Sequence, residues 1–379
     1  MKILSIFGTR PEAVKMAPLI KELENDCELE SFICITAQHR EMLDQVMEIF
    51  NLTADYDLDI MTKSQTLVDI TTKVLTGVSI ILDDLHPDLV LVHGDTTTSF
   101  AASLAAFYKQ IPVGDVEAGL RSFNKYEPFP EEINRRLTGV IADVHFSPTA
   151  TSKQNLLAEG VSAESIFITG NTVIDVLKTT IIPNYRFKTS ILNLLNNKDN
   201  KIITITAHRR ENLGQPLRNI CCAIKELIST HGDLEIVYAV HKNPAVMNIV
   251  DEVLSGVDRV HLVPPLDLKD MHNLLNLSYL ILTDSGGLQE EVPALNKPVL
   301  VLRNVTERPE GIEAGTLKLV GTDTANIVYN VNTLLTNQVE YKKMSTAKNP
   351  FGDGFSSARI VSAIKYFLNL SDIRIKDYN

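Results

Sequence analysis

Residues 2–15 read KILSIFGTRPEAVK, a short apolar run that passes through one glycine into a helical pattern. Gly8 permits a tight turn there, and Pro11 suits the first turn of a helix. Similar apolar runs recur along the chain and alternate with further helical patterns. Near-continuous apolar strands separated by helices are typical of parallel sheets covered on both faces. We therefore predict an α/β fold.

The predicted strands fall into two series. The first series comprises residues 3–7, 31–36, 89–93, 113–117, 144–146 and 165–169, and the second comprises 201–206, 235–240, 260–263, 279–283 and 299–302. Each series predicts one doubly wound, Rossmann-like parallel-sheet domain. We place the first domain at residues 1–169 and the second at 170–355, with their strand ends facing one cleft. A last amphipathic helix at 356–370 is expected to pack on the protein.

Composition limits the classes of partner. A chain of 379 residues with 44% hydrophobic and 22% charged residues is globular and long enough for two domains. Its 36 Lys and Arg against 47 Asp and Glu give a net charge of −11, which argues against a nucleic-acid scaffold. No apolar stretch suits a membrane span, and residues 1–8 are too short for a signal peptide. Cysteines at 27, 34, 221 and 222 lack CxxC spacing and suit reduced, cytosolic core thiols.

Polar residues after the first strand form a candidate anion site. In open parallel sheets, ligands bind outside the carboxyl ends of the strands. Arg10 and Lys15 place positive charge beside a helix start, where free N–H groups favour an anion. The stretch is neither GxGxxG nor a P-loop, so it does not predict dinucleotide or NTPase chemistry. An ordinary turn with solvated basic side chains explains it equally well.

A stronger signal follows the strand at residues 279–283. The stretch 283–291 reads TDSGGLQEE, and Gly286 and Gly287 at a helix start allow backbone amides to approach a diphosphate closely. Ser285 can add a hydroxyl donor, and the Glu291 carboxylate can accept both hydroxyls of a ribose. The alternative is a capping turn followed by a surface glutamate.

Three acids stand at predicted strand ends or helix starts in the first half. Asp95 follows one strand, Glu117 ends the next, and Glu131 begins a helix. Asp95 and Glu131 are also explained as helix-start residues, whereas Glu117 terminates a strand that should be buried on both faces. Together they can supply general acid and base groups. No His or Cys spacing supports a metal site.

Cations and histidines stand at strand ends of the second series. His208 follows its first strand and His241 a later one. The run from Arg303 to Arg308 can clamp an anion. A capping histidine and a polar loop are the structural alternatives.

Several motifs in one order resemble those of a known family. They are GTRPE at 8–12, HGDTT at 93–97, VEAGLR at 116–121, PEEINR at 130–135, TAHRREN at 206–212 and TDSGGLQEE at 283–291. Over nearly the whole chain the sequence is similar to the bacterial non-hydrolysing UDP-N-acetylglucosamine 2-epimerases. The resemblance implies the glycosyltransferase-B architecture and a last helix, 356–379, that joins the first domain. It implies UDP-N-acetylglucosamine as substrate, a cytosolic homodimer, and a product used for surface glycans such as teichoic acid or capsule.

The resemblance also implies roles for individual residues. The catalytic set is Asp95, Glu117, Glu131 and His208, and UDP and sugar are bound by Arg10, Lys15, Ser285, Gly286, Gly287, Glu291 and Arg308. Bacterial members often need their substrate as an allosteric activator, and the residues similar to that effector pocket are Gln38, His39, Gln65, Arg209 and His241. Position 64 is a departure, because Ser64 stands where many members carry Arg.

The chemistry expected of such an enzyme is elimination of UDP and its re-addition to the other face. It needs anion binding, two acid/base groups and exclusion of water, but no nicotinamide and no metal. A hydrolysing epimerase or a glycosyltransferase of the same architecture is the alternative enzyme. A sugar-nucleotide-binding regulator without turnover is the alternative of another class.

Overall fold

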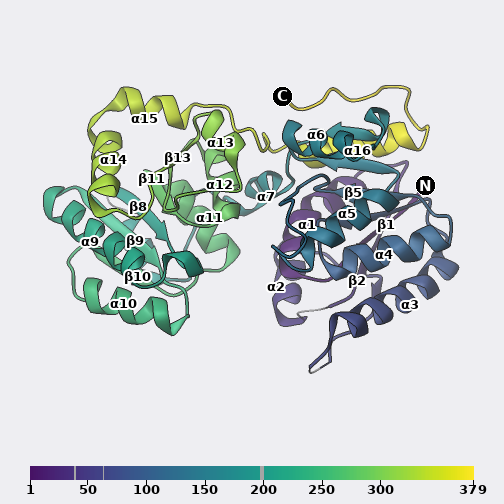
Figure 1. The fold of residues 1–379 in the computed structure, drawn as a ribbon, viewed down its shortest axis with the longest axis horizontal. Helices are drawn as coiled ribbons and strands as arrows, with labels where there is room; N and C mark the ends of the chain where they lie inside the picture. Colours follow the sequence, from purple (N-terminus) through teal and green to yellow (C-terminus); the bar gives the residue numbers. More distant parts are fainter. Residues whose placement is uncertain (38–39, 63, 197–199) are drawn as a thin grey trace. The chain divides into compact units, whose positions relative to one another are not determined.

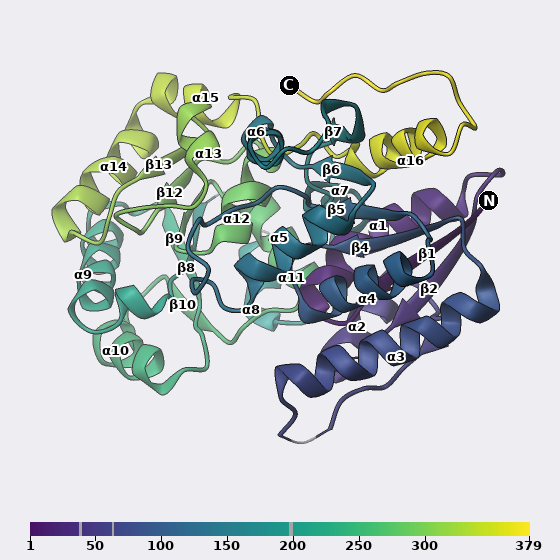
Figure 2. The same ribbon diagram turned by 45° about the vertical axis from the view of Figure 1, so that its right-hand side comes forward.

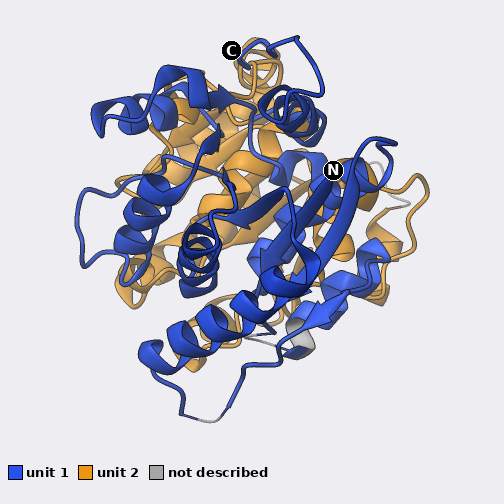
Figure 3. Cartoon of the chain, turned by 90° about the vertical axis from the view of Figure 1, so that its right-hand side faces the viewer, with its two compact units in different colours: residues 1–176, 352–379 blue, residues 177–351 orange. Residues whose placement is uncertain are grey.

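The computed structural model describes residues 1–37, 40–62, 64–196 and 200–379. They form two compact units (Figure 3): unit 1 consists of Met1–Val176 and Gly352–Asn379, and unit 2 of Leu177–Phe351. Residues 170–176, which we assigned to the second domain, lie in unit 1. The reason is local, because the Asn171 side chain bonds to Glu117 and the Asp175 carboxylate accepts N–H groups of the segment after residue 351.

Unit 1 is built on a parallel sheet whose seven described strands have the order β3-β2-β1-β4-β5-β6-β7. The strands are β1 (Lys2–Phe7), β2 (Glu30–Ile35), β3 (Tyr56–Asp57), β4 (Leu89–His93), β5 (Val113–Val116), β6 (Val144–Ser147) and β7 (Ile166–Ile168). The helices are α1 (Arg10–Glu24), α2 (Arg40–Phe50), α3 (Leu67–Leu85), α4 (Thr97–Tyr108), α5 (Glu131–Ile141), α6 (Ala150–Ala158), α7 (Val173–Thr180, which runs on into unit 2) and α16 (Ser356–Phe367). The strand order reverses between β1 and β4, which makes their carboxyl ends the switch point.

Unit 2 repeats the plan with the order β10-β9-β8-β11-β12-β13, all parallel, over its described residues. Its strands are β8 (Lys201–Thr206), β9 (Leu234–Ala239), β10 (Val260–Val263), β11 (Leu280–Thr283), β12 (Val299–Val301) and β13 (Leu317–Leu319). Its helices are α8 (Ser190–Leu195), α9 (Gln215–Thr230), α10 (Pro244–Leu254), α11 (Leu268–Leu277), α12 (Gly286–Glu291), α13 (Pro309–Glu313), α14 (Thr324–Thr336) and α15 (Gln338–Ser345). The switch point lies between β8 and β11. The predicted α/β class with two doubly wound parallel sheets is confirmed.

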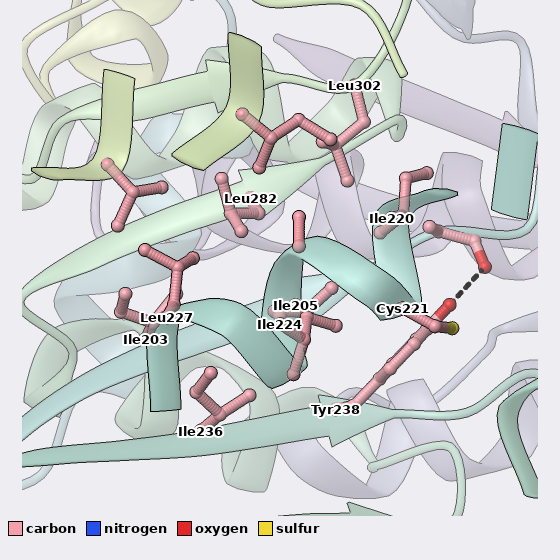
Figure 4. Close-up of a cluster of buried hydrophobic side chains, with 14 of the residues drawn as sticks. Ile203, Ile205, Ile220, Cys221, Ile224, Leu227, Ile236, Tyr238, Leu282 and Leu302 are labelled. Atoms are coloured by element: carbon pink, nitrogen blue, oxygen red, sulfur yellow. Dashed lines mark hydrogen bonds between the residues drawn. The ribbon is translucent and has the colours of Figure 1, made fainter. Parts of the chain in front are cut away.

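Alternation along the strands produces the core of unit 2. On β11, Leu280 and Leu282 pack on one face of the sheet with α9, α10 and α14, whereas Ile281 packs on the other face with α11 and α12. Figure 4 shows the first cluster, in which the Tyr238 hydroxyl donates to the carbonyl of Ala207 at 3.0 Å. The one polar group of this ring is thus satisfied while the ring itself is buried.

The final helix packs on unit 1 as its periodicity predicts. Ile360 and Ile364 are fully buried, and α16 lies against α1 (Figures 1 and 2). Lys365 in its last turn pairs with Asp26 at 2.9 Å and with Glu28 at 2.5 Å. Residues 352–379 therefore complete the unit with which the chain begins.

Two short edge strands and two cysteines differ from expectation. The sequence missed β3 and β13, because each is only a few residues long and carries an exposed charged residue, Asp57 or Lys318. All four cysteines are free, but only Cys34 and Cys221 are buried, so the expectation of core thiols is wrong for Cys27 and Cys222. No helix in the described ranges has both the length and the apolar character needed to cross a membrane.

Leu282→Ala tests the unit 2 core. The side chain is fully buried, and its truncation is expected to lower the free energy of unfolding by about 2–5 kcal/mol through lost burial and a residual cavity. The matched control is Leu194→Ala on α8, where the side chain is 63% exposed and the expected change is within about 0.5 kcal/mol. Urea unfolding followed by circular dichroism measures both. Equal losses in the two variants would contradict the packing described.

Candidate functional site

The switch point of unit 1 is closed by a buried carboxylate. Glu12 on α1 accepts the N–H groups of Gly8 at 3.1 Å and Thr9 at 2.7 Å, both in the turn after β1. It also accepts the hydroxyls of Thr96 at 2.7 Å and Ser99 at 3.1 Å, which follow β4. Burial raises the pKa of Glu12, and these hydrogen bonds oppose that rise. One side chain thus holds two neighbouring turns together at the sheet edge.

Gly8 is required by close approach at the same place. A Cβ atom there would lie 2.1 Å from the Thr36 hydroxyl and 2.8 Å from the Thr98 hydroxyl, which are themselves 3.0 Å apart. Arg10 begins α1 beside this turn, and within the described residues its side chain has no ion pair. Arg10, which was predicted for the anion site, is therefore a cation beside a tightly packed turn.

Glu117 follows β5 and is buried at the centre of a polar cluster. Its carboxylate pairs with Lys15 of α1 and accepts an N–H of Asn171 at 2.8 Å. The Nε2 atom of His93, the last residue of β4, lies 3.9 Å from the other carboxylate oxygen. The backbone of Glu117 has a φ of 69°, an uncommon value for a residue with a side chain. Strained positions of this kind are concentrated at functional sites.

The partners of Glu117 decide its charge. Burial opposes ionisation, but Lys15, His93 and Asn171 together lower the pKa of Glu117. Burial lowers the pKa of His93 to about 4, against the attraction of Glu117. Near neutral pH, Glu117 is therefore an ionised carboxylate beside a neutral histidine, which suits a group that accepts a proton.

Helix α5 connects the other two predicted acids. Glu131 is its first residue, and Asn134 and Arg135 follow at helical spacing on the same side. Arg135 donates to the Asp95 carboxylate at 2.6 Å, and the Asn134 amide donates to the Asp95 carbonyl at 2.9 Å. One oxygen of Glu131 is buried and has no hydrogen-bond partner among the described residues. Asp95 and Glu131 are thus held by one helix.

A second polar layer lies deeper in the sheet of unit 1. Asp115 on β5 and His145 on β6 are cross-strand neighbours, and both are buried. Arg121, whose side chain is 1% exposed, forms two hydrogen bonds to Glu159. Burial raises the pKa of Asp115 well above its usual range despite Arg121, and burial together with Arg121 lowers the pKa of His145 to about 4.

The switch point of unit 2 is also closed by a buried carboxylate. Asp284 follows β11 and accepts the N–H groups of His208 at 2.7 Å and Arg209 at 2.8 Å, in the turn after β8. It also accepts an N–H of the Asn212 amide at 2.9 Å. Its other oxygen lies 3.5 Å from Nδ1 of His208. The loop that carries His208 and Arg209 is therefore fixed to the start of the double-glycine segment.

Two guanidinium groups flank the double glycine. A Cβ atom on Gly286 would lie 3.7 Å from an Nη atom of Arg209 and 3.7 Å from one of Arg308. Arg308 is held by Glu290, and the Glu290 carbonyl accepts from Asn349 at 2.9 Å. Ser285 is half-buried at the start of α12. The glycine backbone, which allows close approach, and the two guanidinium groups together suit the binding of a diphosphate.

Glu291 is supported by a pair of residues that we had not predicted. The Nε2 atom of buried His272 lies 3.1 Å from the Glu291 carboxylate, and its Nδ1 atom lies 2.7 Å from the Thr180 hydroxyl. An imidazole N–H donated to a carboxylate fixes the position of that carboxylate. No sequence signal pointed to His272, because it is a buried residue of α11 and the strand β11 separates it from Glu291 in the chain.

The residues predicted for an effector are divided between the two units and the part of the chain that is not described. Gln38 and His39 lie outside the described residues. Gln65 is in unit 1, where its amide donates to the Ile60 carbonyl at 2.7 Å, while Arg209 and His241 are in unit 2. The His241 ring stacks on the His208 ring with centroids 5.1 Å apart. Burial, His241 and Arg209 lower the pKa of His208, against the attraction of Asp284.

The sequence and the fold of this chain match those of known proteins. The family described as UDP-N-acetylglucosamine 2-epimerase matches residues 21–365. A Bacillus subtilis protein named UDP-N-acetylglucosamine 2-epimerase is 54% identical over 366 residues, covering 97% of this chain and 95% of that protein. S. aureus MnaA, solved with UDP, is 50% identical with a TM-score of 0.87 over 100% of both chains. The Neisseria meningitidis UDP-GlcNAc 2-epimerase, solved with UDP-GlcNAc, is 48% identical with a TM-score of 0.82, covering 96% of this chain and 99% of that one.

His145→Gln tests the buried polar layer through the pH dependence of stability. The unfolded chain binds a proton at this histidine below about pH 6.5, whereas the folded chain excludes it until about pH 4. Folding stability is therefore lost as the pH falls through this window, by up to about 3 kcal/mol from this group. The variant is expected to lose less stability between pH 6.5 and 4 than the unsubstituted protein, as measured by urea unfolding at each pH. The control His86→Gln changes an exposed histidine, and an equally shallow slope there would contradict the assignment.

Proposed function

Because the chain belongs to the UDP-N-acetylglucosamine 2-epimerase family, we propose that it inverts carbon 2 of UDP-N-acetylglucosamine to give UDP-N-acetylmannosamine, reversibly and without net hydrolysis. The observation that carries the proposal is the ionised Glu117 carboxylate at the ligand edge of unit 1, within reach of Lys15 and His93. Relatives of similar sequence have been solved with UDP and with UDP-GlcNAc. The ligand of this chain is proposed by analogy with them.

The proposed reaction begins with loss of the diphosphate. Carbon 2 has no adjacent carbonyl, so its proton becomes acidic only as positive charge develops at the anomeric carbon. The bond between carbon 1 and the phosphate oxygen breaks, UDP takes the electron pair, and a carboxylate removes the proton on carbon 2. A glycal and UDP result, and an acid group then protonates carbon 2 on the opposite face while the phosphate oxygen re-adds to carbon 1. Asp95, Glu117 and Glu131 are the proposed acid/base groups.

The nucleotide is assigned to unit 2. Arg209 and Arg308 converge on Gly286, so they would stabilise negative charge that develops on the leaving diphosphate. His208 and Ser285 add donors at the same switch point, and Glu291, supported by His272, would accept the ribose hydroxyls. Arg10 and Lys15 of unit 1 are proposed to contact the substrate as well. Charge stabilisation of this kind lowers the barrier because it grows as the bond breaks.

Three further features belong to the same proposal. Unit 1 exposes apolar side chains on the adjacent helices α3, α4 and α5, among them Ile80, Phe107, Tyr108 and Val140, which supports a homodimer through these helices. Activation by a second substrate molecule would involve Gln65, Arg209 and His241, with Gln38 and His39. Surface-glycan synthesis and a cytosolic location come from the family resemblance.

Incubation in deuterated water tests the proposed reaction. With UDP-GlcNAc at a concentration high enough to serve also as an effector, we expect deuterium at carbon 2 and formation of the manno epimer, both visible by proton NMR. Glu117→Gln removes the acid/base group and is expected to abolish both while UDP binding by calorimetry is retained. Free sugar with stoichiometric UDP would indicate a hydrolysing enzyme instead. Absence of both exchange and epimer from the unsubstituted protein would refute the proposal.

Gly286→Val tests the assignment of the diphosphate. The added methyl groups would occupy the space between the guanidinium groups of Arg209 and Arg308, so the Kd for UDP is expected to rise at least about tenfold, or about 1.4 kcal/mol. Isothermal titration calorimetry measures this. The matched control is Gly232→Val, because a Cβ at Gly232 has no neighbour within 4 Å. Unchanged affinity in Gly286→Val would move the diphosphate site elsewhere.

A further inference from the structure

Asn171 lies between β7 and α7 and has an amide whose orientation is fixed. Its side-chain oxygen accepts the N–H of Val173 at 3.1 Å, so the NH₂ end is turned to Glu117 and donates at 2.8 Å. The residue is 3% exposed. A primary amide nitrogen can only donate, which makes the ionised form of Glu117 the better partner. Asn171 is the second residue of the predicted second domain and is not among the predicted site residues.

We propose that Asn171 is a positioning residue that holds the Glu117 carboxylate in one orientation and in its ionised form for proton transfer. The proposal rests on the function proposed above for Glu117. Asn171 itself is not assigned a contact with substrate.

The backbone around Asn171 is a rigid support. Its carbonyl accepts the Ser356 hydroxyl at 3.2 Å, and the nearby Asp175 carboxylate accepts the N–H groups of Ser356 at 3.1 Å and Ser357 at 2.6 Å. Gly352 has a φ of 148°, and a Cβ there would lie 3.1 Å from Ile174. These contacts fasten together the two places where the chain passes between the units. Asn171 therefore connects Glu117 to a fixed point of unit 1.

The titratable groups around Glu117 lie on three elements besides the Asn171 loop. Lys15 on α1 and His93 at the end of β4 favour the carboxylate, and Asp115 lies two residues earlier on β5. The ammonium group of Lys15 lies at the end of a flexible side chain, so it restrains the carboxylate less than a fixed amide does. Without Asn171, Glu117 keeps its counter-ion but loses its orientation. The loss should therefore fall on kcat rather than on substrate binding.

Two substitutions separate orientation from charge. Asn171→Ala removes the donor, and we expect kcat for epimerisation to fall about tenfold or more while KM stays within about threefold. Asn171→Asp keeps the shape but places a second carboxyl group against Glu117, so the pair should share a proton. The acidic limb of the kcat/KM profile is then expected to lie at higher pH than in the unsubstituted protein. Ser356→Ala, which removes the hydroxyl on the Asn171 carbonyl and leaves the amide in place, is the matched control.

The outcomes can be told apart. A pH profile of Asn171→Asp that coincides with that of the unsubstituted protein over pH 5–8 would overturn the proposal, as would a loss in Asn171→Ala that lies in KM alone. An acidic limb in Ser356→Ala equal to that in Asn171→Asp would also overturn it, because the effect would then arise from the backbone. UDP titration and circular dichroism establish that each variant is folded. If Asn171→Ala does not fold, the isosteric variant Asn171→Asp carries the test. Exchange by Glu117→Gln would instead refute the role of Glu117.

Discussion

Each unit depends on a buried carboxylate that closes the switch point of its sheet. In unit 1, Glu12 on α1 accepts hydroxyl groups of residues that follow β4. In unit 2, Asp284 follows β11 and accepts N–H groups of the turn after β8. The strand order forces two neighbouring loops apart at this point and leaves backbone donors unpaired. A carboxylate that accepts several of them fixes both loops, and Arg10, Asp95, His208 and Ser285 directly follow the four strands concerned.

The two units use this common edge for opposite electrostatic tasks. In unit 1, Lys15, His93 and Asn171 together keep the buried Glu117 carboxylate ionised. Around Gly286, unit 2 gathers guanidinium groups on small backbone. Proton transfer needs the first arrangement and a departing diphosphate the second. On the function proposed above, one architecture, built twice, would supply a site for proton transfer in unit 1 and a basic site for the diphosphate in unit 2.

Much of the fold was predictable because it is written in local patterns. The strands predicted at 89–93 and 201–206 are observed with those bounds as β4 and β8, and the other long apolar runs form the remaining central strands. The strand-end rule also led to Asp95, Glu117, His208 and Ser285. Its limit is contact across distant segments: Asn171 meets Glu117 over 54 positions and Thr180 meets His272 over 92. Such polar pairs have no periodicity and follow from the packing of complete elements, so spacing alone could not reveal them.

The position of α16 has a consequence for synthesis. Lys365 on α16 reaches Asp26 and Glu28, so unit 1 is completed by residues that leave the ribosome after the whole of unit 2. Unit 2 is one continuous stretch, and its whole sequence emerges earlier. Domains fold largely as units during translation, so unit 2 can finish folding before unit 1. Until α16 has been synthesised, the apolar surface of unit 1 on which it packs stays uncovered.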